Sequence, residues 1–347
     1  MSMALELADN GRGLVHPNPL VGAILVHDGQ VIGTGYHTRF GAPHAEVEAI
    51  RDANKSGHDP RGSTLYVTLE PCCHQGKTPP CTDAIIEAGI ARVVFAIEDP
   101  HEVVAGKGAA RLRDAGIEIA SGVMETEARR QNEAFIRFQT TGLPFVTWKF
   151  ARTLDGSLTL VPGRRTRISC EESDRRVDVM RSEADAVLVG VETVRIDDPS
   201  LRVRSGAGRD PWRIVFDSSL RISESCSLVR NNVDSRTLVV AGQDAPERNL
   251  GAEVIRVPLK NGRIDPGAAL SALARRGLLA ILLESGRTLA GSLIAERLVQ
   301  RLVAITAPRW NSGEQILEGT FARIQDSGDD CLLVLNLAPD DPPGARS

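Results

Sequence analysis

Residues 44–54 read HAEVEAIRDAN, and residues 64–72 read TLYVTLEPC. The first stretch has apolar residues at helical spacing, so it predicts a helix that begins at His44. The second is an apolar run typical of a buried strand over residues 64–69. A further helix is expected from Cys81 to Ala88, after two prolines and before a glycine, and a further strand over residues 92–97. Strands that alternate with helices favour an α/β layer.

The same stretch carries metal-binding chemistry. His44, Cys72 and Cys81 offer one imidazole and two thiols, and Glu46 lies beside the histidine. Three protein ligands and a water are typical of catalytic zinc, whereas structural zinc sites are closed by four protein ligands. We therefore predict a catalytic Zn²⁺ site, one ion per chain, with Glu46 as the group that moves protons. His44 and Cys81 lie at expected helix starts, where amide N–H groups and the positive end of the helix dipole favour a thiolate over a thiol.

A closed structural zinc site is the alternative, because Cys73 and His74 could each supply a fourth ligand. We favour the open site since the side chains of neighbouring Cys72 and Cys73 point in different directions. Glu46 would also have no purpose in a closed site.

Length and composition limit the class of protein. At 347 residues, two domains are expected. The net charge of −4, the interspersed charges and the 4% aromatic content exclude a basic, aromatic-rich nucleic-acid surface. No apolar run approaches a membrane span, and no secretory signal is evident. The clustered cysteines are not a disulfide framework, so we expect a cytoplasmic protein that contacts no membrane.

The rest of the chain divides near Gly142-Leu143-Pro144, which gives expected domains of residues 1–143 and 144–347. In the first we expect a short helix at residues 4–8, a hairpin of residues 21–26 and 30–36 around Asp28-Gly29, and one long helix over residues 125–141. In the second we expect loops at residues 203–211 and 311–319, and strands at residues 145–151, 186–189, 213–216, 237–240, 278–283, 302–305 and 332–337.

Five short motifs make the first half resemble the deaminase half of the bifunctional riboflavin-biosynthesis deaminase/reductase family. They are residues 16–22 (HPNPLVG), 35–37 (GYH), 43–46 (PHAE), 68–72 (TLEPC) and 76–81 (GKTPPC). A His-x-Glu followed by Pro-Cys and a second Cys is the pattern of zinc deaminases. The resemblance implies a cytidine-deaminase-like α/β/α domain. Its implied substrate is a diamino-ribosylamino-pyrimidinone 5′-phosphate, and the residues implied to contact it are Asn18, His37, His74, Lys77 and Thr78.

The second half resembles the reductase of the same family, which implies a dihydrofolate-reductase-like α/β fold and the cofactor NADPH. The matching stretches include Lys149, residues 154–156 (LDG), 190–193 (GVET), 197–199 (DDP) and 284–291 (ESGRTLAG). The last joins an apolar strand to a helix start through a glycine turn, an arrangement that holds phosphate oxygens. The resemblance implies that substrate contacts Arg181, Leu201, Arg204 and Glu284. It implies that NADPH contacts Ala151, Thr193, Asp197, Ser218, Gly286, Arg287, Thr288, Leu289, Ala290, Gly291 and Ser292.

The chain departs from the family pattern at several places. His101 and Glu102 follow Asp99-Pro100 where the family continues Asn-Pro, and Arg165 and Arg167 stand where it usually has Ser and Trp. Two hypotheses follow: a bifunctional enzyme, or a deaminase whose reductase domain no longer reduces. A zinc-stabilised scaffold without catalysis is a third hypothesis, and we also expect a homo-oligomer, either dimer or tetramer.

Residues 106–108 (GKG) faintly suggest a dinucleotide-binding loop, but the third glycine and the following acidic residue of that motif are missing. We interpret them as a loop of the first domain and not as a cofactor site.

Overall fold

The computed structural model describes residues 1–75, 79–100, 106–161, 163–164, 166–206 and 208–311, together with the backbone of strands 316–327 and 330–337. The chain forms two compact units. One contains residues 1–145 and 270–280, and the other contains residues 146–269 and 281–347.

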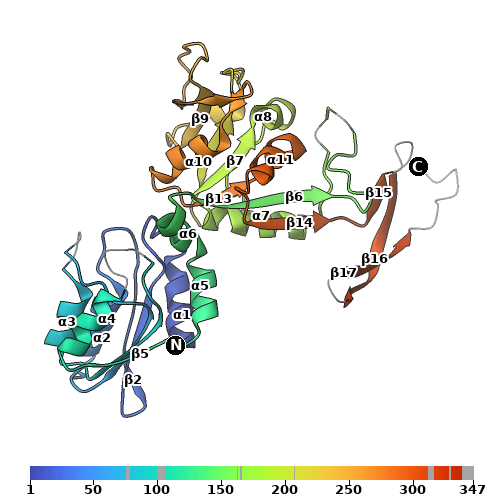
Figure 1. Cartoon of the computed structure of the whole chain (residues 1–347). Coiled ribbons are helices and arrows are strands. Elements are labelled where there is room, and N and C mark those ends of the chain that lie inside the picture. Colours follow the sequence, from blue (N-terminus) through green and yellow to red (C-terminus); the bar gives the residue numbers. More distant parts are fainter. Residues whose placement is uncertain are drawn as a thin grey trace. The chain divides into compact units, whose positions relative to one another are not determined.

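The first unit is a five-stranded sheet between two layers of helices (Figure 1). The strand order is β2-β1-β3-β4-β5, in which β1 runs antiparallel to β2 and β3, and β3, β4 and β5 run parallel. Helices α1 and α5 pack on one face of the sheet and α2, α3 and α4 on the other. The elements are α1 (Ser2–Ala8), the short 3-10 helix η1 (Asp9–Gly11), β1 (Gly22–His27), β2 (Gln30–Tyr36), α2 (Ala45–Lys55), β3 (Thr64–Leu69), α3 (Cys81–Glu87), β4 (Arg92–Ile97), α4 (Lys107–Asp114), β5 (Glu118–Ser121), α5 (Glu125–Gln131) and α6 (Glu133–Thr141).

The β1–β2 hairpin has the turn that its sequence predicts. Asp28 and Gly29 both have positive φ, 48° and 76°, and connect two strands that pair from Gly22 with Tyr36 to His27 with Gln30. Two central residues with positive φ suit the twist of a two-residue hairpin, and an Asp-Gly pair adopts them at low cost.

Helix α2 lies unusually close to β2. A Cβ on Gly35 would lie 2.3 Å from the Ala45 carbonyl oxygen, and one on Gly33 would lie 2.3 Å from that of Ala49. Only glycine permits this approach of helix to strand. Because His44 is the N-cap of α2, the close packing fixes where the histidine and Glu46 enter the site.

The prediction of a single helix over residues 125–141 is wrong. The structure has two helices, α5 and α6, that meet at Asn132, whose ψ of 19° leaves the helical region. The Asn132 side chain accepts a hydrogen bond from the Leu20 N–H (2.7 Å) and donates one to the Leu20 carbonyl (2.9 Å). This buried pairing with a distant loop outweighs the continuous helical pattern of the segment.

The second unit contains a seven-stranded sheet of order β10-β9-β8-β7-β13-β6-β14 (Figure 1). Strands β7 to β10 run parallel, β13 runs parallel to β7, and β14 runs parallel to β6. The elements are β6 (Phe145–Arg152), α7 (Glu171–Glu183), β7 (Ala186–Gly190), α8 (Val191–Asp197), β8 (Trp212–Phe216), α9 (Ser227–Arg230), β9 (Thr237–Gly242), β10 (Glu253–Val257), β11 (Leu259–Lys260), β12 (Arg263–Ile264), α10 (Pro266–Ala274), β13 (Ala280–Leu283), α11 (Arg287–Ala295) and β14 (Arg301–Thr306).

A separate antiparallel sheet ends the chain and corrects another expectation. Residues 311–319 were expected to be a loop. Instead β15 (Arg309–Asn311) pairs with β16 (Ile316–Ser327), and β16 pairs with β17 (Asp330–Leu337). Asn311 and residues 316–319 therefore lie in strands, whereas residues 312–315 lie outside the described residues. Glu318, Gly319 and Thr320 interrupt the apolar pattern of β16 soon after its start, so pairing with two neighbouring strands, and not apolar composition, defines this strand. In the part of the chain that the structure describes, no helix is long and apolar enough to cross a bilayer.

Candidate active sites

The first site forms where α2, the loop after β3 and α3 meet. His44 precedes α2, Cys72 lies two residues after Glu70, and Cys81 is the first residue of α3. His44 Nδ1 lies 3.1 Å from Cys81 Sγ and 3.5 Å from Cys72 Sγ. Within the described residues these three side chains form a cluster whose ligand atoms all lie within 4.8 Å of one another.

These distances fit one shared zinc ion. Zn–S bonds of about 2.3 Å and Zn–N bonds of about 2.0 Å at tetrahedral angles separate the nitrogen and sulfur atoms by about 3.5 Å. Cys73 and His74, which could have closed the site, are not members of the described cluster. The donor set is thus the three-ligand type, with a coordination position left for solvent.

The charges in the cluster also suit a cation. Hydrogen bonding with the Cys81 thiol lowers the pKa of Cys72, against the opposing effect of burial. Cys72 Sγ also accepts a hydrogen bond from the Cys81 backbone N–H (3.3 Å), at the start of α3. The thiolate is the metal-binding form of cysteine. The surroundings of Cys72 therefore favour its metal-binding form.

Glu46 lies beside this cluster and is 3% exposed. Burial raises its pKa to about 7, although the nearby His44 charge opposes the shift. Among the described residues, its Oε2 atom has no hydrogen-bond partner. A carboxylate whose pKa is close to neutral can both accept and donate a proton there.

A cavity of about 360 Å³ opens over the cluster. Of the residues expected to contact substrate, Asn18, His37 and His74 line it, whereas Lys77 and Thr78 lie outside the described residues. Phe135 and Phe138 of α6 form an apolar part of the wall. No sequence motif marks these two phenylalanines, although their spacing places them on one face of a helix.

His37 and Asn18 are held in fixed orientations in this cavity. The His37 ring contacts the Pro43 carbonyl through Nδ1 (3.1 Å) and the Asn18 amide through Nε2 (3.0 Å). Burial lowers the pKa of His37, so the neutral ring is favoured. A neutral ring that donates from Nδ1 accepts at Nε2 from the amide of Asn18.

The second site is a cavity of about 1820 Å³ at the carboxyl ends of the parallel strands. Ala151 of β6, Gly190 of β7, Phe216 of β8 and Glu284 after β13 all line it. In open α/β sheets this edge is the usual ligand-binding edge.

The start of α11 suits a phosphate group. Gly286 is the N-cap, and in the described structure no side chain caps it; a Cβ added there would meet nothing within 4 Å. The first N–H groups of a helix bind anions, and the helix dipole favours negative charge there. Nine of the residues expected to contact NADPH line the cavity: Ala151, Thr193, Asp197, Ser218, Gly286, Arg287, Thr288, Leu289 and Ser292. Ala290 is buried, and neither it nor Gly291 is among the lining residues.

The residues expected to contact substrate divide into two pairs. Glu284 and Arg204 line the cavity, whereas Arg181 and Leu201 are buried behind it, at 5% and 2% exposure. Arg181 forms a two-pronged ion pair with Glu284, Nε to Oε1 at 2.6 Å and an Nη to Oε2 at 3.0 Å. Lys149 Nζ lies 3.5 Å from the same carboxylate. Burial opposes the ionisation of Glu284, but the charges of Arg181 and Lys149 outweigh it and lower its pKa.

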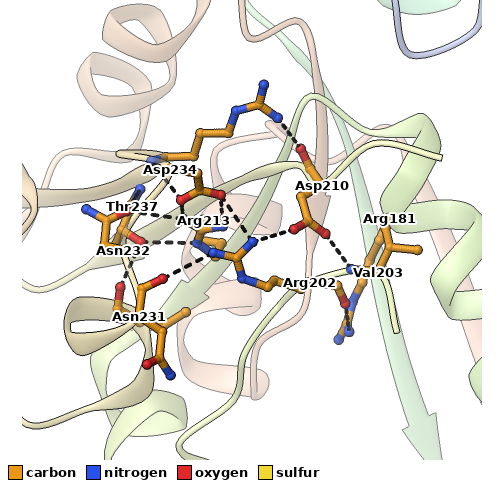
Figure 2. Close-up of polar contacts among 11 residues, drawn as sticks. Arg181, Arg202, Val203, Asp210, Arg213, Asn231, Asn232, Asp234 and Thr237 are labelled. Atoms are coloured by element: carbon orange, nitrogen blue, oxygen red, sulfur yellow. Dashed lines mark hydrogen bonds and ion pairs between the residues drawn. The ribbon is translucent and has the colours of Figure 1, made fainter. Parts of the chain in front are cut away.

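The segment that carries Arg204 is held by side chains of α7 and of the loop before β8, and Figure 2 shows the contacts at Arg202 and Val203. Asp178 of α7 accepts hydrogen bonds from the backbone N–H groups of Arg204 and Ser205, each at 3.0 Å. Asp210 accepts one from the Val203 N–H (2.9 Å) and pairs with the Arg202 guanidinium (2.6 Å). The position of Arg204 at the cavity is therefore defined by its backbone.

Behind this segment, a buried arginine pairs with a more exposed aspartate, and no sequence motif marks either residue (Figure 2). Arg213 of β8 is 2% exposed, and its guanidinium donates to Asp234 (3.0 Å) and Asn232 (3.1 Å). Hydrogen bonds from Arg213 hold the pKa of Asp234 well below its usual range. Neither residue lines the cavity, so the pair joins the starts of β8 and β9 and does not bind ligand.

Of the two unexpected arginines, Arg167 lines the second cavity and Arg165 lies outside the described residues. Arg167 pairs with Asp174 at 3.0 Å, and its side chain is 55% exposed.

Family models match both halves of the chain. Residues 1–97 match the cytidine and deoxycytidylate deaminase zinc-binding region, and residues 144–311 match the RibD C-terminal domain. A zinc-binding deaminase unit and an NADPH-dependent reductase unit are thus joined in one chain, a bifunctional hydrolase and oxidoreductase.

Relatives match over nearly the whole chain. The riboflavin biosynthesis protein RibD of Aquifex aeolicus is 41% identical over 89% of this chain and 86% of its own length, and that of Escherichia coli is 38% identical over 89% and 87%. A solved Acinetobacter baumannii RibD has a TM-score of 0.80 at 31% identity and covers 97% of this chain and 98% of its own. A Thermotoga maritima deaminase/reductase has a TM-score of 0.81 at 34% identity, with 97% of both chains covered. The chain belongs to the RibD family of riboflavin biosynthesis.

Family membership confirms the predicted fold class, with a cytidine-deaminase-like first domain and a reductase second domain. It also favours the bifunctional enzyme over the alternative of a deaminase with an inactive second domain.

Proposed function

We propose that residues 1–143 hydrolyse the ring 2-amino group of 2,5-diamino-6-ribosylamino-4(3H)-pyrimidinone 5′-phosphate and that residues 144–347 then reduce its ribosyl group to ribityl with NADPH. The Thermotoga maritima relative is described as a diaminohydroxyphosphoribosylaminopyrimidine deaminase/5-amino-6-(5-phosphoribosylamino)uracil reductase. The observation that carries the proposal for this chain is the cluster of His44, Cys72 and Cys81 with the buried carboxylate of Glu46 beside it.

In the deamination, His44, Cys72 and Cys81 hold zinc, which when bound supplies a water activated as a nucleophile at neutral pH. Glu46 holds and moves the proton at Oε2: it accepts one from water and delivers it to the leaving amine. Water replaces the amino group, so the ring gains a carbonyl oxygen and ammonia leaves. Asn18, His37 and His74 line the cavity for the base and ribose phosphate, and the family resemblance adds Lys77 and Thr78 as substrate-binding residues.

Substitution of Glu46 by Gln tests this assignment. The isosteric amide cannot accept and return the proton, so we expect the rate of ammonia release to fall by about 10²–10⁴-fold. The zinc content, measured by elemental analysis, should equal that of the parent. The control is Glu48→Gln on the same helix, whose partly exposed carboxylate pairs with Arg51. Full activity in Glu46→Gln would contradict the proposal and favour a zinc-stabilised scaffold.

In the reduction, NADPH supplies the hydride when bound. The start of α11 and the hydroxyls of Thr193, Ser218 and Ser292 hold its phosphates and ribose, together with Ala151, Asp197 and the cavity-lining residues Gly286, Arg287, Thr288 and Leu289. Arg204 and Glu284 contact the substrate from the cavity wall. Arg181 and Leu201 support them from behind, and this role differs from the direct contact that the sequence implied.

Arg204→Gln tests the second assignment. We expect the KM for the deaminated substrate to rise about tenfold, the effect of losing one charged contact of about 1.4 kcal/mol, while the Kd for NADPH stays the same. Arg175→Gln is the control, because Arg175 is exposed on α7 and pairs only with neighbouring Glu172 among the contacts described. An unchanged KM in Arg204→Gln would contradict its role.

The proposal includes a cytoplasmic location, a homo-oligomer and no nucleic-acid partner. Free cysteines in and around the zinc cluster suit a reducing compartment. Apolar side chains such as Leu302, 59% exposed on the edge strand β14, offer surface for a second subunit. Light scattering of the purified chain tests this, and a monomer would contradict the oligomer.

A further inference from the structure

Glu70 lies between β3 and the zinc-site cysteine Cys72, and the proposed chemistry gives it no role. Its side chain is 2% exposed. Its backbone N–H donates to the Ile97 carbonyl (2.9 Å), which extends the pairing of β3 with β4 by one residue. A buried carboxylate is costly unless its oxygens are satisfied, so its partners explain why it is there.

Both carboxylate oxygens accept backbone N–H groups. Oε1 accepts from Ala109 (3.0 Å), and Oε2 accepts from Gly106 (2.9 Å) and Asp99 (3.3 Å). Gly106 is the N-cap of α4, and Ala109 lies in its first turn. The start of α4 therefore receives a carboxylate of its own chain, which its N–H groups and dipole stabilise.

Gly108 brings the same turn of α4 onto the backbone that leads to Cys72. A Cβ on Gly108 would lie 2.0 Å from the Pro71 carbonyl oxygen and 3.2 Å from Glu70 Oε1. The Gly106-Lys107-Gly108 segment, expected to be a loop, thus includes the first turn of α4. Gly108 permits the close contact with Pro71 and Glu70, and Gly106 supplies the left-handed backbone of the N-cap.

Cys72 is held from its other side by α3. Its carbonyl accepts the Thr82 N–H (3.2 Å), and its Sγ accepts the Cys81 N–H (3.3 Å). The short Glu70-Pro71-Cys72 segment is therefore fixed at one end by α4 and at the other by α3. Movement of Glu70 would displace Cys72 Sγ from its place 3.5 Å from His44 Nδ1.

We propose that Glu70 is a positioning residue for the zinc site: its carboxylate joins the start of α4 to the Pro71-Cys72 segment and so sets the position of the Cys72 sulfur. This inference rests on the proposed metal role of His44, Cys72 and Cys81. Glu70 is not one of the clustered metal ligands. It lines the cavity over the cluster, but its carboxylate oxygens are turned to the backbone N–H groups of Ala109, Gly106 and Asp99.

The test is Glu70→Gln, which keeps the shape but turns an N–H₂ group toward backbone donors. We expect zinc affinity, measured by competition with a chromogenic chelator, to fall about 10–100-fold, the usual effect of removing a group that orients a metal ligand. In the Co²⁺-substituted protein, the thiolate charge-transfer and d–d bands should shift or weaken. Glu118→Gln, an exposed carboxylate on β5, should change neither. Parent-like affinity and spectra in Glu70→Gln would overturn the proposal.

Two further variants separate positioning from loss of stability. Gly108→Ala pushes α4 away from Pro71 with the carboxylate intact, and we expect the same loss of zinc affinity. Leu112→Ala opens a cavity in the buried face of α4 and should lower the Tm with zinc affinity unchanged. A loss of zinc affinity in Leu112→Ala equal to that in Glu70→Gln would overturn the specific role of Glu70, as would parent affinity in a folded Gly108→Ala.

The variant His44→Ala distinguishes failure of this inference from failure of the proposed function. Loss of zinc in His44→Ala but not in Glu70→Gln would overturn only the positioning role. Retained zinc in His44→Ala would overturn the metal site itself and the inference with it.

Discussion

At the scale of single residues, the pair of Arg181 and Glu284 shows how a buried charge can serve a site without contacting its ligand. Arg181 is turned inward and binds both oxygens of Glu284, whose carboxylate lines the second cavity. An arginine held in this way fixes the orientation of its partner, because its planar fork matches the carboxylate.

We predict that Arg181→Met destabilises the second unit by about 3 kcal/mol near pH 7, since it leaves a buried carboxylate short of its main partner. The pKa of Glu284 is lowered in the folded protein. The ion pair of Glu284 with Arg181 therefore stabilises the fold fully above about pH 4.3, the ordinary pKa of glutamate. That effect is lost as the pH falls through the lower native pKa. The Tm difference between parent and variant should therefore narrow in acid.

Calorimetry across this pH range checks the prediction, with Arg175→Met as the control. Arg175 forms an exposed pair with Glu172 on the same helix, and exposed pairs contribute little. A Tm difference for Arg181→Met that stays constant into acid would contradict the role assigned to Glu284.

At the scale of elements, the zinc site depends on how closely α2 approaches β2. Gly33 and Gly35 allow the backbone of α2 to lie against the strand, and His44 and Glu46 are carried on the first turn of that helix. On an ideal helix, residues two apart point in different directions. Because His44 is a cap with extended backbone, at ψ 163°, both side chains reach the same cavity.

We predict that Gly35→Ala lowers the Tm of the first unit and reduces ammonia release. The new Cβ would lie 2.3 Å from the Ala45 carbonyl oxygen and 2.4 Å from the Ala49 nitrogen, and such overpacking costs about 1–3 kcal/mol. Thermal unfolding and an ammonia assay measure the two effects. Gly251→Ala, whose Cβ would meet only ordinary contacts from 3.6 Å, should leave both unchanged. Parent-like values for Gly35→Ala would show that the close approach is dispensable.

At the scale of the whole molecule, each unit contains its own cavity. The described lining of the first cavity belongs to residues 17–139, and that of the second to residues 149–311. The zinc cluster lies wholly in the first unit. Only the deamination therefore requires the zinc ligands, although the two reactions act on successive forms of one substrate.

Removal of zinc should separate the two activities. After dialysis against a strong chelator, we expect ammonia release to disappear, while NADPH oxidation with the already deaminated substrate continues at the parent rate. Added Zn²⁺ should restore deamination. Parallel loss of both activities at unchanged Tm would contradict independent sites.

The sequence by itself determined the features that depend on short spacing or on local backbone preference. The Asp28-Gly29 turn, the strand before Glu70 and the helix starts at His44 and Cys81 follow from local chemistry, and the proposed zinc ligands lie on those elements. The family resemblance added the second domain and its cofactor, which the comparisons support.

Tertiary structure decided what depends on contact between distant segments. Asn132 ends a helix because it pairs with Leu20, and Arg181 lies behind its cavity because Glu284, far along the chain, draws its guanidinium inward. Glu70 acquires a role because the start of α4 lies against it. A sequence pattern records which residues neighbour one another on the same element, but a buried polar group takes the partner that folding brings to it.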